Sequence, residues 1–218
     1  MLEKMVSMLN MRGMKEVMNN IIPLHATPLY YLHDADYRCD DDEWDSLNKV
    51  VYEKSHDNYL SKSQYVLSDY GLHNLMRLCK YHLDIYTRDI LKIDQTFRIT
   101  NSWLSKKTPG QSHHIHNHPN SIFSGVFYIN VKDSEIFFEN TPPILKDYKF
   151  DYTYSEWNLL NSPRWSVEVT TGSMVIFPSH LNHGVEVNES DETRIVLGFN
   201  SFVTGKLNNY GYCTDLTL

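Results

Sequence analysis

The chain has 218 residues, which is enough for one well-buried domain and too few for two large ones. Its composition, 41% apolar and 22% charged, is that of a soluble globular protein. The net charge is 20 minus 27, or −7, without a basic run, which argues against a broad surface that binds the phosphates of duplex nucleic acid.

Cysteine usage and hydropathy indicate the compartment. Cys39, Cys79 and Cys213 are few, odd in number and far apart, which argues against a disulfide framework and favours a reducing environment. No apolar run approaches the roughly 18 residues of a membrane span. Charged residues such as Glu3 and Arg12 interrupt the N-terminus where a signal peptide is apolar. We therefore expect a cytoplasmic protein that does not contact the membrane.

Two segments precede the acidic run at residues 40–43. Methionines recur at helical spacing over residues 1–20, which predicts a docking helix or leader outside the main domain. A Met-rich groove for a partner is the alternative. Residues 21–36 are apolar and punctuated by prolines, which predicts an edge strand. A single domain is expected over residues 21–218, with its core at about 95–205.

Two further helices are predicted before residue 95. The acidic run DDDEW suits a helix N-terminus and predicts a helix that continues to about His56. Apolar residues at helical spacing over 71–91 predict the clearest helix of the chain. Its His73 and His82 are expected at the surface or at a boundary, and not as ligands.

After residue 95 the apolar period changes from 3.6 to 2, which predicts strands. A long insert at 140–164, rich in tyrosine and containing Trp157, separates two of them and is a candidate substrate lid. Helices followed by many short strands predict a mainly β fold, an antiparallel sandwich or jelly roll buttressed by N-terminal helices. The predicted strands are TFRITNSWL, IFSGVFYIN, EIFFEN, WSVEVT, SMVIF, HGVEV and TRIVLGFNSFV.

Four of the 11 histidines lie in HHIHNH, residues 113–118. In an extended chain His114, His116 and His118 would share one face, with His113 on the other. Neighbouring same-face residues are about 7 Å apart, so this strand is expected to supply two ligands to one metal ion. A third ligand must come from elsewhere.

The segment FPSHLNHGVEVN offers His180 and His183 just after a predicted strand. Two histidines from one strand and one from another would form a facial ligand set that leaves positions open, as in non-haem iron sites. A chance cluster of surface histidines near turns is the alternative.

The quoted strands also carry a family resemblance. The blocks HNHPNSIFSGVFYI, TTGSMVIFPSHLNHGVEVN and TRIVLGFN resemble the 2-oxoglutarate/Fe(II)-dependent oxygenase superfamily, and more narrowly a branch with an H-x-H-P-N-S…S-G-V-x-Y block. The resemblance covers about residues 97–204, with weaker similarity around Thr27 to Tyr30. It implies a cupin-like double-stranded β-helix.

The resemblance implies residue roles. His116 matches the first iron ligand, His183 the distal ligand, and Arg194 the clamp on the far carboxylate of 2-oxoglutarate, which its planar fork can pair bidentately. The superfamily places Asp or Glu where this chain has His118, which removes one negative charge from the metal ligands. Two other ligand pairs stay open, namely His114 with His116, or His118 with Asn120.

Further strand and turn residues are assigned more weakly. Tyr128 is placed like strand residues that contact 2-oxoglutarate in relatives, with a core tyrosine as the alternative. Ser124 and Asn120 are candidates to bind the cosubstrate or to order His118, with turn chemistry as the alternative. Asn200 is expected to face the pocket, and Trp103 to pack.

The implied chemistry is that of an oxidoreductase, a dioxygenase that uses Fe(II), 2-oxoglutarate and O2 and releases succinate and CO2 as it hydroxylates a substrate. The substrate would be a protein side chain such as prolyl, or a small metabolite, and a homodimer is left open. Two rivals remain, a three-His zinc hydrolase or lyase and a non-catalytic jelly roll with a degenerate site.

Overall fold

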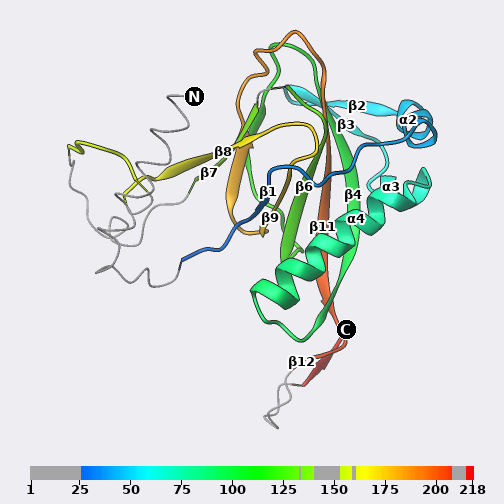
Figure 1. The fold of residues 1–218 in the computed structure, drawn as a ribbon, viewed down its shortest axis with the longest axis vertical. Coiled ribbons are helices and arrows are strands. Elements are labelled where there is room, and N and C mark those ends of the chain that lie inside the picture. Colours follow the sequence, from blue (N-terminus) through cyan, green and yellow to red (C-terminus); the bar gives the residue numbers. More distant parts are fainter. Residues whose placement is uncertain (1–25, 133, 140–152, 159–160, 208–214) are drawn as a thin grey trace.

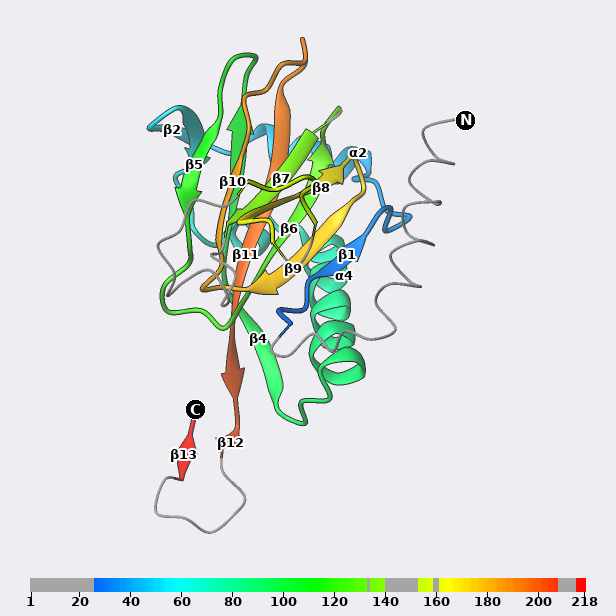
Figure 2. The ribbon, with the colours of Figure 1, turned by 90° about the vertical axis from the view of Figure 1, so that its left-hand side faces the viewer.

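Two antiparallel sheets lie face to face, and most of their strands come from the second half of the chain. The computed structural model describes residues 26–132, 134–139, 153–158, 161–207 and 215–218, and Figures 1 and 2 show how the sheets stack. The larger sheet has the strand order β1-β9-β6-β11-β4-β3-β2, and the smaller has β5-β10-β7-β8. The prediction of a mainly β jelly roll is confirmed.

The strand bounds follow the predicted segments from residue 96 onward. In the larger sheet they are β1 (Tyr30–Leu32), β2 (Tyr52–Ser55), β3 (Asn58–Ser61), β4 (Thr96–Lys107), β6 (Phe123–Asn130), β9 (Met174–Pro178) and β11 (Arg194–Thr204). In the smaller sheet they are β5 (His113–His116), β7 (Ser134–Glu139), β8 (Arg164–Val169) and β10 (Asn182–Val185). A short pair, β12 (Lys206–Leu207) and β13 (Leu216–Thr217), lies near the C-terminus.

Successive residues of the central strands enter two different cores, as the period-2 pattern requires. On β6, Phe127 belongs to the core under the helices while Tyr128 belongs to the core between the sheets. On β11, Leu197 and Val196 divide in the same way. The larger sheet is therefore buried on both faces, and its inner face forms one wall of the space between the sheets.

The helices buttress the face of the larger sheet that points away from the smaller one. They are α2 (Asp41–Asn48), α3 (Val66–Asp69) and α4 (His73–Asp84), and α4 continues as a π-helical turn, η2 (Ile85–Ile90). In Figure 1, α4 crosses the strands of this sheet, and its buried Leu75, Cys79 and Leu83 pack there with Phe199. The prediction of N-terminal helices covering the sheet is confirmed.

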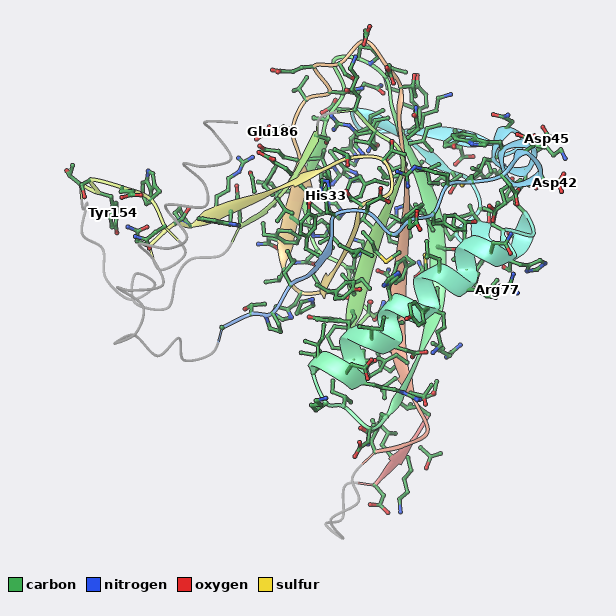
Figure 3. The ribbon with its side chains drawn as sticks, viewed as in Figure 1. His33, Asp42, Asp45, Arg77, Tyr154 and Glu186 are labelled. Atoms are coloured by element: carbon green, nitrogen blue, oxygen red, sulfur yellow. The ribbon has the colours of Figure 1, made fainter. Side chains whose placement is uncertain are left out.

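Glu43 of α2 is buried, but the other charged side chains of α2 and α4 are partly or fully exposed, as amphipathic helices require. Figure 3 shows Asp42 and Asp45 on α2 and Arg77 on α4 projecting outward. His73 is exposed as expected, but His82 is buried and its ring shares a 2.8 Å hydrogen bond with Tyr30. The expectation of a surface or boundary position was therefore wrong for His82, which ties α4 to β1.

The helix predicted to run to about His56 ends at Asn48. Asp40 and Glu43 form a capping box that starts α2. The chain then enters the β2–β3 hairpin, with His56 in its turn at a φ of 48°. The hairpin extends the larger sheet beyond β4, so pairing with a neighbouring strand overrides the helical pattern here.

Several predictions fall on parts of the chain that the structure does not describe. The Met-rich segment 1–20 lies outside the described residues, as does most of the insert at 140–164. Within that insert, Trp157 is exposed and packs on Tyr154 at 4.6 Å between ring centroids. Among the residues that are described, no helix is long and apolar enough to cross a bilayer, and Cys39 and Cys79 are free thiols.

Candidate metal centre and anion subsite

Three histidines converge between the two sheets. His116 ends β5, His118 follows it, and His183 lies on β10 directly opposite His116 in the strand register. One ring nitrogen from each lies within 4.8 Å of those of the other two. His118 Nε2 and His183 Nε2 are 3.2 Å apart. The structure thus brings together the three predicted metal ligands.

A bulge in the β5–β10 pair decides which histidines face the cavity. His116 pairs with His183, and His113 pairs with Val185. The two pairs are three residues apart on β5 but only two residues apart on β10, so β5 carries one extra residue. An extra residue on one strand of a pair shifts the alternation of its side chains. His113 therefore lies on the same side as His116, with the rings stacked at 4.4 Å. The expectation that His113 would face away, on the side opposite His116, was wrong.

His114 and His180 do not join the cluster. Both are exposed, and neither lines the cavity that contains His116, His118 and His183. The strand supplies His116, the following loop supplies His118, and β10 supplies the third imidazole from His183. The alternative pair of His114 with His116 finds no support in this geometry.

The Nδ1 atom of each imidazole in the cluster forms a hydrogen bond with a carbonyl oxygen. His116 donates to the carbonyl oxygen of His114 and His183 to that of Leu181, both at 2.9 Å. His118 Nδ1 lies 2.7 Å from Asn200 Oδ1. Because a carbonyl oxygen only accepts, the proton sits on Nδ1 and the Nε2 lone pair stays free, which is the tautomer a metal ligand needs.

Burial keeps the three rings neutral. Desolvation lowers the pKa of His116, and it lowers the pKa of His118 to about 4 and that of His183 to about 3. Two neutral Nε2 lone pairs at 3.2 Å repel each other unless a cation lies between them. Metal–nitrogen bonds of about 2.0–2.1 Å give nitrogen separations of about 3.0–3.4 Å at one ion. The donor set therefore fits a divalent transition metal.

Two buried cations stand at the other end of the same cavity. Lys107 and Arg194 are 1% and 5% exposed, and they are direct partners in the β4–β11 register. Lys107 Nζ donates to Ser105 Oγ at 3.0 Å, and Arg194 Nη2 donates to Asn188 Oδ1 at 3.4 Å. Arg194 Nε and Nη1 have no partner among the described residues. Like charges buried side by side without a carboxylate are costly, which indicates that an anion belongs between them.

Burial shifts the pKa of both cations, and for Lys107 the charge of Arg194 adds to the shift. Desolvation, then the charge of Arg194, lowers the pKa of Lys107 to about 7. Burial lowers the pKa of Arg194, and it raises the pKa of Tyr128, which stays protonated. The Tyr128 hydroxyl also lacks a hydrogen-bond partner among the described residues. Lys107, Arg194 and Tyr128 together offer several unused donors to one anionic group.

The two ends share one cavity with a volume of about 40 Å³. This is room for about three water molecules, so a larger occupant must displace rotatable side chains such as that of Lys107. No carboxylate is among the described residues that line it. The lining residues are Trp103, Ser105, Lys107, His113, His116, His118, Val126, Tyr128, Ile136, His183, Val185, Arg194, Val196 and Gly198.

Two predicted cosubstrate residues lie away from this cavity. Asn120 is exposed, in a turn at a φ of 59°. Ser124 is fully buried, and its hydroxyl donates to Asn200 Oδ1 at 2.7 Å. Ser124 therefore supports Asn200, which in turn fixes the ring of His118. This matches the expectation that Ser124 orders His118, and not the expectation that it binds the cosubstrate.

Sequence reasoning missed Lys107 and gave Trp103 only a packing role. Trp103 lines the cavity, with its ring centroid 5.2 Å from that of His118. A Cβ on Gly198 would lie 2.5 Å from the Trp103 ring, so this glycine makes room for the indole. Lys107 could have been found from strand alternation. Trp103, Ser105 and Lys107 are every second residue of one strand, so their side chains face the same side.

A family model matches the stretch that carries all of these residues. Its description is "Putative 2OG-Fe(II) oxygenase", and it matches residues 101–200. Residues 101–200 are thus similar in sequence to the 2OG-Fe(II) oxygenase family. The predicted family and enzyme class are confirmed, and the oxygenase segment runs from β4 to β11. No curated protein matches the chain in sequence.

Solved structures show the same fold at low sequence identity. A 2OG-Fe(II) oxygenase family oxidoreductase from Burkholderia pseudomallei is 12% identical, with a TM-score of 0.56 over 79% of this chain and 83% of that one. HygX from Streptomyces hygroscopicus, with nickel and 2-oxoglutarate bound, is 11% identical, with a TM-score of 0.55 over 87% and 86%. The non-haem α-ketoglutarate-dependent epimerase SnoN from nogalamycin biosynthesis is 12% identical, with a TM-score of 0.56 over 86% and 83%. The oxygenase fold therefore extends beyond the matched segment.

Proposed function

We propose that the chain is an Fe(II)- and 2-oxoglutarate-dependent hydroxylase, with His116, His118 and His183 as the metal ligands. One observation carries this proposal: a converging set of neutral imidazoles and a pair of unpaired cations occupy opposite ends of one cavity. A cosubstrate with a metal-binding keto acid at one end and a free carboxylate at the other matches both ends at once. HygX, which has the same fold, holds a metal and 2-oxoglutarate.

The residues of the chain would divide the work by position. The three imidazoles hold Fe(II) and leave positions open, since they occupy only one side of the ion. Arg194, Lys107 and Tyr128 bind the far carboxylate, and their hydrogen bonds are strong because the donors are charged or buried. Iron, 2-oxoglutarate and O2 supply the oxidising power when bound, with succinate and CO2 as co-products.

The substrate is proposed at the level of a class. Either a protein side chain, such as prolyl, or a small metabolite suits an oxygenase of this fold, because fold and metal site do not select between them. Substrate choice would depend on residues at the mouth of the cavity and on the insert at 140–164.

Uncoupled succinate formation tests the proposal without knowledge of the substrate. The chain is loaded with Fe(II) without oxygen, mixed with 2-oxoglutarate and air, and assayed for succinate. We expect turnover in the parent, and none in His116→Ala, His183→Ala or Arg194→Met. Arg98→Met, which changes an exposed arginine on β4, serves as the matched control and should keep the parent rate.

The rival functions give different results in the same samples. A three-His zinc hydrolase or lyase would bind zinc stoichiometrically. With Fe(II) and 2-oxoglutarate it would show none of the visible absorption expected when both bind to one site. Such an enzyme would also give Arg194 and Lys107 no role. A non-catalytic protein would form no succinate above the level of Arg194→Met. Either result would overturn the proposed oxygenase activity.

A further inference from the structure

Two exposed histidines meet outside the cavity. His56 lies in the turn between β2 and β3, and His114 lies on β5. Their ring centroids are 4.6 Å apart, with 46° between the ring planes. β2 and β5 are edge strands of two different sheets, and Figure 2 shows them on the same side of the molecule. The pair therefore bridges the two sheets at their rims.

The spacing of this pair matches that of the three-His cluster. Ring centroids in the cluster are 4.3 Å apart for His116 and His183, and 5.0 Å apart for His118 and His183. The 4.6 Å between His56 and His114 falls between these values. Neither ring takes part in a hydrogen bond or ion pair with another described residue. Imidazoles with free lone pairs at this spacing suit a divalent transition metal, with water completing its coordination.

A continuous series of imidazoles joins this pair to the cluster. The ring of His114 lies 5.3 Å from that of His113 and 5.4 Å from that of His116. His113 in turn stacks on His116 at 4.4 Å, and His116 is a member of the cluster. An ion at the surface pair would thus meet a new nitrogen donor at each step inward. The bulge in β5 makes this series of imidazoles continuous, because it turns His113 inward while His114 stays exposed.

We propose that His56 and His114 form a surface site for a divalent transition-metal ion, and that this site loads the three-His cluster by way of His113 and His116. The surface site stands on its own geometry. Its loading role rests on the proposed metal centre, so the two parts need separate readouts.

Calorimetric titration of the metal-free chain with Ni²⁺ tests the surface site. We expect two binding events in the parent, a tight one at the cluster and a weaker one at the surface pair. His56→Asn should lose only the weaker event, because asparagine tolerates the positive φ of this turn and the fold is kept. His183→Ala should lose only the tight event. His73→Asn, at an exposed histidine on α4, is the matched control and should keep both.

The time course of Ni²⁺ uptake at limiting concentration tests the loading role. We expect His56→Asn and His114→Asn to fill the tight site more slowly than the parent, with its final affinity unchanged. Equal rates in these variants and the parent would overturn the loading role.

The titration separates failure of the surface site from failure of the centre. One event in the parent that persists in His56→Asn and disappears in His183→Ala would overturn the surface site and leave the proposed function intact. One event that disappears in His56→Asn and persists in His183→Ala would support the surface site, and it would overturn both the metal centre and the loading role.

Discussion

Replacing Lys107 by methionine should stabilise the cosubstrate-free protein and weaken its binding of 2-oxoglutarate. Lys107 is 1% exposed, and among the described residues its ammonium donates only to Ser105 Oγ. Methionine keeps most of the length of the side chain and removes the charge. The folded chain is then spared a buried ammonium next to Arg194, while the anion subsite loses a donor.

The magnitude follows from the pKa of Lys107. Burial and the charge of Arg194 lower it from 10.5 to about 7. A difference of about 3.5, at about 1.4 kcal/mol for each pKa unit, sets an upper limit of about 5 kcal/mol on the cost of the buried charge below pH 7. We expect Lys107→Met to recover on the order of 2–5 kcal/mol, which corresponds to a rise in melting temperature of about 5–15 °C for a chain of this size.

Because folding lowers the pKa of Lys107, the free energy of unfolding depends on pH with a definite sign. The unfolded chain binds more protons than the folded chain between pH 7 and pH 10.5, since the lysine is protonated only in the unfolded state there. The contribution of Lys107 to the free energy of unfolding therefore rises across this range in the parent. In Lys107→Met this contribution is absent, so the stability difference between the two chains shrinks as the pH rises.

Thermal melts of the metal-free chains from pH 6 to pH 10 measure the stability effect. Titration of the Ni²⁺-loaded chains with 2-oxoglutarate measures the affinity, which should fall by about ten- to a hundredfold for one lost hydrogen bond to a charged donor. Lys106→Met, the same change at the neighbouring residue that does not line the cavity, is the control. A Lys107→Met chain with unchanged melting temperature and unchanged 2-oxoglutarate affinity would refute the anion subsite.

Three further substitutions test the positioning of the centre. Asn200→Ala removes the acceptor that orients His118 and should lower Ni²⁺ affinity by about ten- to a hundredfold, measured by titration; unchanged affinity would show that the ring needs no such support. His118→Asp should keep or improve Fe(II) binding because it restores a carboxylate, and complete loss of binding would contradict the ligand assignment. Gly198→Ala should lower the free energy of unfolding by about 1–3 kcal/mol in denaturant melts, because its Cβ would meet the Trp103 ring; an unchanged midpoint would show that the indole moves freely.

The sequence located the strands well because burial alternates along them. The core segment from Thr96 to Thr204 contains all seven predicted strands. Pattern reading failed where pairing with a distant strand decides the structure. The segment after Asn48 forms strands because β2 pairs with β3 and β3 pairs with the distant β4, and no local signal shows that.

The site was predictable in its residue types and less so in its arrangement. Three histidines and Arg194 could be named from motif and spacing. The inward position of His113 depends on a bulge, and the meeting of Lys107 with Arg194 depends on the β4–β11 register. Both arise from the alignment of strands far apart in the chain, which alternation within one strand does not encode.

The place of His116 on an edge strand has a consequence for handling the protein. Within the part of the chain that the structure describes, β5 pairs with β10 alone, and His116 faces His183 across that pair. An ion bound by both histidines would cross-link β5 to β10, and a chelator that removes the ion would release β5 from its sheet. A freed edge strand offers unpaired backbone groups to other chains. Metal-free preparations should therefore self-associate more readily than loaded ones, and light scattering before and after chelation would show it.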